Sequence, residues 1–417
     1  MSSAKFQPAK RLHGTEKNVW VDISRLAVEN KALNLGQGFP DFMAPETVIS
    51  CLRDVANSDN PLLHQYARSF GHPRLVNALA AVYEPHLQRL VDPITDILIS
   101  VGAYGSLFCI IQGLVNPGDE VIIIEPFYDC YLPMVTVAQG IPVPVPLKPT
   151  KDGSRTSSAD WKFDPEEMAS KFNSKTKLII INTPSNPLGK VFTKDELKIV
   201  ADLCKKHDVV CVADEVYEWM TYDNNKHLKI ATLPDMWERT LTVGSAGKTF
   251  SVTGWKIGWC IGPKHLINCA QIVHQNCNYT CPTPIQEAIA RGLEIEISRI
   301  GTPECYLTAL SEQLRPKRDY LATVLAEAGL KPVVPQAGYF MLADFSSLDV
   351  DIPDGDETKD FRFVRWLTIN KKLTVIPPSA FYSEEHRDLA ENLVRFCFIK
   401  EDSTLEKAEE ILRNWKK

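Results

Sequence analysis

Short, continuous apolar runs rich in β-branched residues recur between residues 97 and 261, and segments with helical character separate them. A strand that is buried on both faces reads as such a run, whereas a strand with one wet face alternates apolar and polar residues. One intervening segment, from Thr193 to Cys204, begins Thr-Lys-Asp-Glu, the pattern of a capping box. The alternation predicts an α/β domain with a mostly parallel sheet flanked by helices. The runs are Ile97–Val101, Val121–Ile124, Leu178–Ile181, Val209–Ala213, Leu241–Val243 and Ile257–Ile261.

The pattern changes after Arg299, where a long helical segment is followed by short alternating strands and a charged terminal helix. The chain has 417 residues, more than the roughly 100–200 of a usual domain. We therefore expect a large domain over residues 44–296 and a smaller α+β domain over residues 297–417, with the N-terminal arm, residues 1–43, packed against the smaller one. The smaller domain is expected to contain a helix over 304–328, strands near 338–343, 373–376 and 394–399, and a helix over 405–415.

Two polar stretches are predicted to be loops. Residues 148–160 look like an excursion between two strands. Residues 349–360 are rich in aspartate, which suggests calcium, but they lack the ligand order of an EF-hand. A solvated acidic loop is therefore the favoured interpretation.

Composition excludes several classes of partner. The formal net charge of −6 is opposite to the basic stripe of a nucleic-acid-binding protein. No apolar stretch approaches the roughly 20 residues of a membrane span, and residues 1–15 are too polar for a secretory signal. The 11 cysteines show no metal-ligand spacing, so no metal is expected. Buried free thiols suit a reducing compartment, which would be cytoplasmic or the mitochondrial matrix, with any transit peptide absent from this chain.

The segment Val243–Gly258 offers the richest chemistry. Lys248 lies among small residues just past a predicted strand, and these neighbours leave room for a bulky group on its amine. A lysine amine can form a Schiff base with a carbonyl cofactor and act as a base once it is released. The sequence Gly-Lys-Thr also suggests a phosphate-binding P-loop, but the first glycine of that motif is replaced by Thr242.

Three further motifs follow predicted strands at the edge where ligands bind in open α/β sheets. Val101-Gly-Ala-Tyr-Gly105 would let backbone amides approach a phosphate, or it is a plain β–turn–α connection. Asn182–Gly189 is a stiff loop with amide donors, or a rigid connector. Asp214 ends a buried strand and needs a cationic partner, such as a protonated pyridine nitrogen, and Tyr217 follows one helical turn later. An ordinary helix N-cap is the alternative for Asp214.

A last candidate lies in the smaller domain. Arg395 is a lone cation in the apolar run Val394–Ile399. The planar guanidinium of arginine suits bidentate binding of a carboxylate. An edge position that faces water explains the same pattern equally well.

Taken in order, these motifs resemble the fold type I, class I aminotransferases over essentially the whole chain. Within that group the chain resembles the kynurenine aminotransferase family, also called glutamine transaminase K or cysteine-conjugate β-lyase. The resemblance implies the fold of pyridoxal-phosphate-dependent transferases and pyridoxal 5′-phosphate as the cofactor. The motifs are Asn34–Asp41, Val101–Gly105, Glu125–Asp129, Asn182–Gly189, Asp214–Tyr217, Gly244–Phe250 and Arg395–Phe398.

The resemblance also implies a role for each motif toward the cofactor. Lys248 would carry it as a Schiff base and move protons, and Asp214 would keep the pyridine nitrogen protonated. Tyr217 would complete this catalytic set by binding the ring 3-oxygen, together with Asn186. The remaining cofactor-binding residues would be Ser245, Lys256, Gly102, Ala103 and Tyr104 at the phosphate, Tyr66 reaching it from the neighbouring subunit, Tyr128 stacked on the ring, and Asn182.

Substrate recognition is implied in the same way. Arg395 would bind the α-carboxylate, helped by Asn186 and the backbone of Gly38. The aromatic walls would favour aromatic and sulfur-containing amino acids, and they would be Trp20, Tyr104 and Tyr279. Two departures from the family pattern stand out: many members have Arg in place of Lys256, and the nearest members have Phe at 128 and 279.

The implied reaction moves the amino group of kynurenine, and of glutamine, aromatic and sulfur-containing amino acids, to a 2-oxo acid, so that kynurenine yields kynurenate. β-Elimination from cysteine S-conjugates is an alternative that shares the early chemistry. A non-catalytic regulator on the same fold is a third possibility, but the sequence shows no added DNA-binding segment. Because active sites are shared between subunits in this family, the resemblance implies a homodimer.

Overall fold

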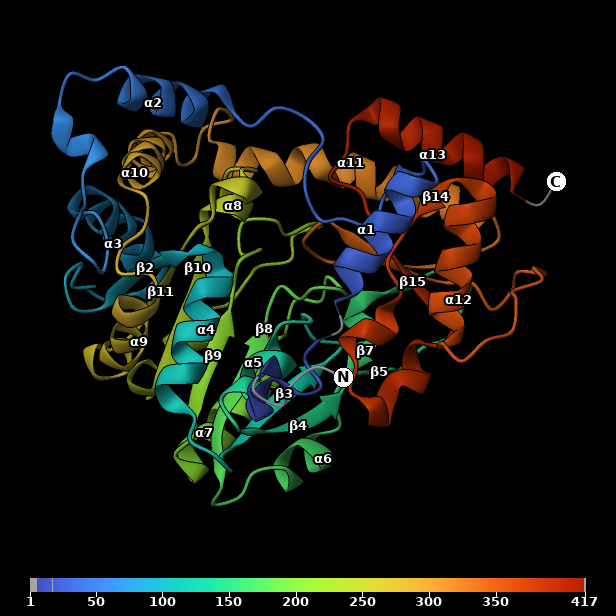
Figure 1. Ribbon diagram of the computed structural model, residues 1–417, viewed down its shortest axis with the longest axis horizontal. Helices are drawn as coiled ribbons and strands as arrows, with labels where there is room; N and C mark the ends of the chain where they lie inside the picture. The colour runs from blue at the N-terminus through green and yellow to red at the C-terminus, as the bar shows by residue number, and fades with distance from the viewer. Residues whose placement is uncertain (1–5, 17, 416–417) are drawn as a thin grey trace.

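The computed structural model describes residues 6–16 and 18–415 (Figure 1). Its α-helices are α1 (Val19–Glu29), α2 (Glu46–Ala56), α3 (Pro73–Leu87), α4 (Gly102–Leu114), α5 (Tyr131–Val137), α6 (Pro165–Ser170), α7 (Lys194–His207), α8 (Ala246–Thr249), α9 (Lys264–Cys277), α10 (Thr283–Ser298), α11 (Tyr306–Glu327), α12 (Lys359–Trp366) and α13 (Asp402–Asn414). Its strands are β1 (Leu33–Asn34), β2 (Ile97–Val101), β3 (Glu120–Glu125), β4 (Ile141–Pro146), β5 (Lys148–Pro149), β6 (Thr156–Ser157), β7 (Trp161–Lys162), β8 (Thr176–Asn182), β9 (Val210–Asp214), β10 (Thr240–Ser245), β11 (Ile257–Ile261), β12 (Lys331–Val334), β13 (Phe340–Asp344), β14 (Leu373–Thr374) and β15 (Leu393–Cys397).

A seven-stranded sheet in the order β2-β11-β10-β9-β8-β3-β4 forms the centre of the larger part of the molecule. Strands β10, β9, β8, β3 and β4 run parallel to one another, whereas β11 is antiparallel to both β10 and β2. Each of the six predicted apolar runs is a strand of this sheet, which confirms the mostly parallel α/β architecture. The predicted capping box is also confirmed, because the Thr193 hydroxyl accepts from the Glu196 amide at the start of α7.

The apolar runs are continuous because both faces of the sheet are covered. In β3, Val121 and Ile123 belong to the hydrophobic cluster that includes α4, α5 and α9 residues. Ile122 and Ile124 belong to the cluster on the other face, with α7. Successive strand residues point to opposite faces, so a strand between two helical layers needs apolar residues at every position.

Strand β4 was not predicted, because prolines alternate through its sequence, Ile141-Pro-Val-Pro-Val-Pro146. The amide of Ile141 donates to Asp119 at 2.8 Å, and the amide of Leu147 donates to Glu125 at 2.7 Å. With this period of two, the prolines occupy the positions that face the open edge of the sheet. Proline is tolerated there because no ladder hydrogen bond is lost.

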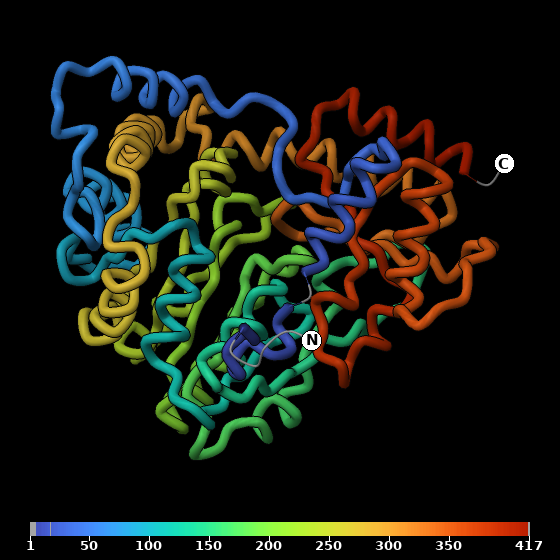
Figure 2. The backbone as a smooth tube through the Cα atoms, in the orientation of Figure 1, coloured from blue at the N-terminus to red at the C-terminus, as the bar shows by residue number. Residues whose placement is uncertain are grey.

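A second sheet, in the order β15-β13-β12-β6, lies in the part of the molecule that holds α11, α12 and α13 (Figure 1). The N-terminal strand β1 pairs with β14, and the tube in Figure 2 shows the blue segment that holds α1 and β1 beside the orange and red C-terminal segments. The predicted excursion over residues 148–160 contributes β6 to this second sheet, where Thr156 pairs with Val333. The domain boundaries at residues 43/44 and 296/297 stay a prediction.

One residue of the acidic stretch 349–360 is not part of a solvated loop. The side chain of Asp360 is fully buried near the start of α12 and accepts from the Ser379 amide at 2.7 Å and the Ser379 hydroxyl at 2.9 Å. No local pattern indicated this, because Ser379 lies far along the chain.

None of the described helices has the length and apolar character needed to cross a membrane.

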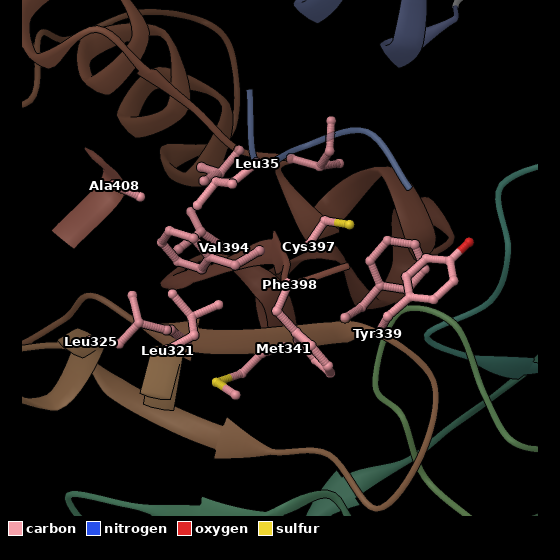
Figure 3. Close-up of a cluster of buried hydrophobic side chains, with 14 of the residues drawn as sticks. Leu35, Leu321, Leu325, Tyr339, Met341, Val394, Cys397, Phe398 and Ala408 are labelled. Atoms are coloured by element: carbon pink, nitrogen blue, oxygen red, sulfur yellow. The ribbon is translucent and has the colours of Figure 1, made fainter. Parts of the chain in front are cut away.

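The smaller part has its own core, in which β13 and β15 residues pack against α11 and α13 (Figure 3). Leu321, Leu325, Met341, Val394 and Phe398 are all at most 1% exposed in this cluster. The core fixes β13 and β15, whose neighbouring residues reach the cavity described next.

Candidate active site

A cavity of about 330 Å³ lies at the carboxyl ends of the parallel strands, a volume suited to a small molecule. Strands β8, β9 and β10 are adjacent, so their last residues meet at this edge. The predicted site residues that line the cavity are Trp20, Gly38, Gly102, Ala103, Tyr104, Tyr128, Asn182, Asn186, Asp214, Tyr217, Ser245, Lys248, Lys256 and Arg395. The lining residues that sequence reasoning missed include Gln37, Phe39, Thr253 and Phe340.

Lys248 lies on the short helix α8, directly after β10. Its amine donates to the Tyr339 hydroxyl at 2.7 Å and to the Gly38 carbonyl at 3.4 Å. Burial lowers the pKa of the Lys248 amine to about 8; Cys397 and Asp214 act to raise it, whereas the positive charges of Arg395 and Lys256 act in the same direction as burial. An amine with this pKa is neutral often enough near pH 7 to act as a nucleophile or a base.

Asp214 ends β9 and is 3% exposed. A turn follows it rather than a helix, so Asp214 does not cap a helix. The Tyr131 hydroxyl donates to its carboxylate at 2.6 Å. Burial raises the Asp214 pKa to about 6, although the bond from Tyr131 acts in the opposite direction. The buried carboxylate has no ion-pair partner within the described ranges, so it can serve a ligand that brings a positive charge.

Tyr131 was not predicted, yet the sequence held a signal. It follows Tyr128 by three positions, so both rings fall on the same side of a helical turn. The two rings meet edge to face, with centroids 6.0 Å apart. One segment therefore supplies both an aromatic wall and the residue that holds Asp214.

The Asn182 side chain shapes the loop that follows β8. Its amide group donates to the Asp214 carbonyl at 2.9 Å, and its oxygen accepts from the Asn186 amide at 2.7 Å. The Asn186 side chain is thereby aimed at Arg395, whose Nη1 donates to Asn186 Oδ1 at 2.9 Å. The motif is therefore a positioned hydrogen-bonding loop and not a plain connector.

An anion cradle is formed at the N-terminus of α4. Gly102 has a φ of +69° and begins the helix, so the amides of the first turn are free to bind a ligand. A Cβ at Gly258 would lie 2.3 Å from the Ala103 amide nitrogen, so only glycine lets β11 approach this helix end. Ser245 and Lys256 line the same cavity, and Lys256 Nζ would lie 3.2 Å from a Cβ at Gly102. Backbone amides, a hydroxyl and an ammonium together suit a phosphate.

Arg395 lies in the edge strand β15, as one alternative expected, but it is fully buried and does not face water. Nη2 donates to the Gly36 carbonyl at 2.7 Å, and Nε is buried with no partner in the described part of the chain. Burial lowers the Arg395 pKa to about 10. A buried guanidinium with unused donors and no carboxylate in contact is a site for a ligand's carboxylate.

Aromatic rings enclose the space beside Arg395. Its guanidinium lies 3.9 Å from the ring centre of Phe340 and 5.1 Å from that of Trp20. The Trp20 indole donates to Asp129 at 2.7 Å, which fixes its orientation. Tyr104 and Tyr128 meet edge to face with centroids 6.5 Å apart. These rings give the cavity a wall suited to an aromatic side chain.

Two predicted residues lie apart from this cavity. Tyr66 is 80% exposed and Tyr279 is 55% exposed, and their rings meet edge to face at 5.5 Å. The cavity lining in the described chain includes neither of them. Their predicted contributions to an active site stay predictions.

The cavity fits pyridoxal 5′-phosphate on three separate features. The α4 cradle with Ser245 and Lys256 suits the phosphate, the buried Asp214 carboxylate suits a protonated ring nitrogen, and the Lys248 amine suits the aldehyde. The unpartnered Nε of Arg395 remains available for a substrate carboxylate.

The comparisons with known proteins agree with this geometry. The family model for aminotransferase class I and II matches residues 30–412. Kynurenine–oxoglutarate transaminase 3 of Mus musculus is 57% identical over 99% of this chain and 90% of its own, and kynurenine–oxoglutarate transaminase 1 of Homo sapiens is 47% identical over 99% of both. The crystal structure of Bna3p from Saccharomyces cerevisiae superposes with a TM-score of 0.90 and 36% identity, over 96% of each chain. The chain therefore belongs to the class I and II aminotransferase family, and it is a transaminase that uses pyridoxal 5′-phosphate.

Proposed function

We propose that this transaminase takes kynurenine as an amino donor and a 2-oxo acid as the acceptor, so that kynurenine yields kynurenate. The observation that carries the proposal is Arg395, a buried cation that no described carboxylate contacts, in one cavity with Lys248 and Asp214. An amino acid and a 2-oxo acid both present a carboxylate to such a group. Relatives that are 44–57% identical over at least 98% of this chain are named kynurenine–oxoglutarate transaminases, which supports the same donor here.

The aromatic wall supports an aromatic donor over a small or acidic one. Trp20 and Phe340 flank Arg395, so a side chain that extends from a bound carboxylate meets ring surfaces. Trp20 is oriented by Asp129, and Tyr104 and Tyr128 add phenol rings on another side. We infer that glutamine, aromatic and sulfur-containing amino acids are further donors for this pocket.

The proposed cofactor ligands follow from the cavity. Ser245, Lys256 and the first amides of α4 would hold the phosphate, Tyr128 would cover the ring, and Asp214 would bind the ring nitrogen. The bound cofactor supplies an electron sink for the negative charge left when the substrate loses its α-proton. Tyr131 keeps the Asp214 carboxylate in place for this task.

The protein's own groups perform the remaining tasks. Arg395 and Asn186 bind and orient the substrate carboxylate, which points the α-carbon into the cavity. Lys248 Nζ removes the α-proton, since its lowered pKa of about 8 allows a neutral amine. Tyr217 lines the cavity beside Lys248 and offers its hydroxyl to the cofactor's ring oxygen.

We further propose a homodimer in which Tyr66 and Tyr279 complete the partner's site. Both rings are exposed although aromatic, and they contact each other outside the cavity of their own chain. Sedimentation of the wild-type protein should give a dimer.

Buried free thiols such as Cys211 and Cys260 support a reducing compartment, either the cytoplasm or the mitochondrial matrix.

The test is an absorbance titration of the purified, cofactor-loaded protein. L-Kynurenine should bleach the visible band of the bound cofactor, and a 2-oxo acid added afterwards should restore it. A band that ignores kynurenine but bleaches with glutamine or phenylalanine would contradict the proposed donor. Arg395→Lys is the matched variant, because it keeps the charge and loses the fork. It should raise the concentration of kynurenine needed for half bleaching by roughly 10- to 100-fold, as expected for charged hydrogen bonds.

A further inference from the structure

Tyr339 makes a contact with Lys248 that none of the roles above uses. Its hydroxyl lies 2.7 Å from Lys248 Nζ and donates to the Gly38 carbonyl at 2.9 Å. The side chain is 1% exposed and sits behind the cavity wall at the start of β13. Figure 3 shows Tyr339 at the rim of the hydrophobic cluster, with its hydroxyl pointing away from the apolar side chains.

The direction of these hydrogen bonds is fixed by the groups involved. A carbonyl oxygen only accepts, so the Tyr339 hydroxyl is the donor in its bond to Gly38, and it accepts in its contacts with the Lys248 amine and the Tyr217 side chain. The phenol oxygen is left as an acceptor for the Lys248 amine. The amine also lies 3.4 Å from the same Gly38 carbonyl. Two acceptors therefore hold the amine on one side.

This arrangement matters most when the amine is neutral. A neutral amine has two hydrogens and one lone pair. When its hydrogens point to Tyr339 and Gly38, the lone pair points away from both acceptors. An amine held in this way is ready to attack a carbonyl or accept a proton, and it loses no orientational freedom at that moment.

The structure keeps Tyr339 itself in place. Its ring meets Tyr217 edge to face at 5.2 Å and lies 4.7 Å from Phe340. A Cβ at Gly38 would lie 2.4 Å from the Phe340 ring, so only glycine allows the Gly38 carbonyl to come this close. The acceptor pair is therefore built by the fold and does not depend on a bound molecule.

We propose that Tyr339 is a positioning residue that, together with the Gly38 carbonyl, orients the free amine of Lys248. The inference rests on the proposed role of Lys248 as nucleophile and base. Tyr339 acts through Lys248 and does not contact the substrate. The charged and titratable groups that face Lys248 are Asp214, Lys256, Arg395, Cys397, Tyr217 and Tyr339.

The experiment measures how fast the full-length apoenzyme captures added pyridoxal 5′-phosphate, from pH 6 to pH 10, in wild type and in Tyr339→Phe. Capture joins the Lys248 nitrogen to the aldehyde carbon and releases one water. Phenylalanine keeps the ring and its contacts, so thermal melting should be close to that of wild type. The plateau rate at high pH should fall by about 3- to 10-fold, the size expected for one lost hydrogen bond.

The pH profile separates positioning from a structural role. The Tyr339 oxygen stabilises the protonated amine more than the neutral one, so its loss should move the midpoint of the profile to lower pH. The matched control is Tyr222→Phe, which removes an equally buried hydroxyl that donates to the adjacent Gly338 carbonyl. That variant should keep the wild-type midpoint and a plateau within about twofold, because its hydroxyl does not contact Lys248.

Two outcomes would overturn the proposal: a Tyr339→Phe profile identical to wild type, or equal changes in Tyr222→Phe. The readout uses no kynurenine, so failure here is distinct from failure of the proposed donor. The Lys248→Ala apoenzyme is measured in the same way. If it captured the cofactor as fast as wild type, the proposed role of Lys248 would fail, and not the proposed donor.

Discussion

Two lysines lie against the same turn of the chain, Lys229 buried and Lys248 half-buried, and the pKa values of their amines shift in opposite directions. Asp214 and Tyr217 of this turn line the cavity with Lys248, whereas Glu215 and Glu218 of the same turn bind Lys229. Burial alone would lower the pKa of either amine. The two carboxylates raise the Lys229 pKa to about 12, but the Lys248 pKa falls to about 8 because no described carboxylate contacts it.

The comparison shows how the neighbouring carboxylates decide what each of these two lysines can do. Lys229 donates to Glu215 at 2.7 Å, and His227 lies 2.9 Å from the same carboxylate. Burial acts to raise the Glu215 pKa, but Lys229 and His227 outweigh it and lower it. Lys229 stays charged and holds the turn through its two carboxylates. Lys248 has no carboxylate in contact within the described ranges, so its amine can be neutral and react.

The largest effect expected is on turnover in Lys248→Ala. Loss of the group that moves the α-proton should lower kcat by roughly 10²- to 10⁴-fold. Stability should not fall, because the removed cation is drawn away from water and has no carboxylate in contact within the described ranges. Transamination rates and urea unfolding of the same preparation test both statements. Turnover by Lys248→Ala at the wild-type rate would contradict the proposed role of Lys248 and the contrast with Lys229.

Lys229→Met should show the reverse pattern. It leaves Glu215 and Glu218 buried with no lysine between them, which should cost about 3–5 kcal/mol of stability. Urea unfolding measures the loss. The control is Lys198→Met, which breaks the exposed pair with Asp202 and should leave the urea unfolding curve close to that of wild type. Equal losses in the two variants would show that burial of the Lys229 pair has no special weight.

The two lysines also differ in how predictable they were. Lys248 was predicted because it follows a strand, lies among small residues and belongs to a motif. Lys229 was not, because its partners are 14 and 11 positions away and no local pattern joins them. Tyr339 was missed for the same reason, since it reaches Lys248 across 91 positions. Local patterns predict strand ends and the residues on them, whereas contacts between distant segments appear only once the chain is folded.

The fold follows the same rule. Continuous apolar runs predicted six strands of the large sheet, because a strand that is buried on both faces has apolar residues at consecutive positions. Strand β4 was missed because its edge position tolerates prolines that ordinarily argue against a strand. The burial of Asp360 could not be predicted from an acidic stretch, since its partner Ser379 lies 19 positions away.

The pH dependence of stability should separate the two lysines in the wild-type apoenzyme. The folded Lys248 pKa of about 8 is below the ordinary lysine value of 10.5, so the unfolded chain holds more protons between these values and stability rises with pH there. Lys248→Met should lack this rise, which is on the order of 1–3 kcal/mol. Lys229 contributes stability that is complete below the ordinary lysine value of 10.5 and is lost as pH rises through its folded pKa of about 12. Urea unfolding at pH 7.5, 9 and 10.5 compares wild type with Lys248→Met. Parallel curves would contradict the low pKa.

The smallest expected effect on stability is that of replacing Asp129. The charge of its carboxylate acts to raise the Arg395 pKa, although the two side chains are not in contact. If Asp129 formed a buried ion pair with Arg395, as Glu215 does with Lys229, Asp129→Asn would lower the free energy of unfolding by about 3–5 kcal/mol. We expect less than about 1 kcal/mol, because its carboxylate is bonded to the Trp20 indole and asparagine retains an oxygen acceptor. Removing the negative charge should also leave KM for kynurenine unchanged or slightly lower, since the substrate carboxylate meets less repulsion beside Arg395.

Asp129→Ala is the matched variant, because it removes the acceptor as well as the charge. The freed indole should raise KM by about fivefold, the effect of roughly 1 kcal/mol, with kcat little changed. Steady-state kinetics with kynurenine and with a small aliphatic donor measure the difference, and the aliphatic donor should be affected less. A large stability loss in Asp129→Asn would instead show that Arg395 already has an ion partner, and the contrast between the paired lysine and the unpaired cavity cations would then hold for Lys248 alone.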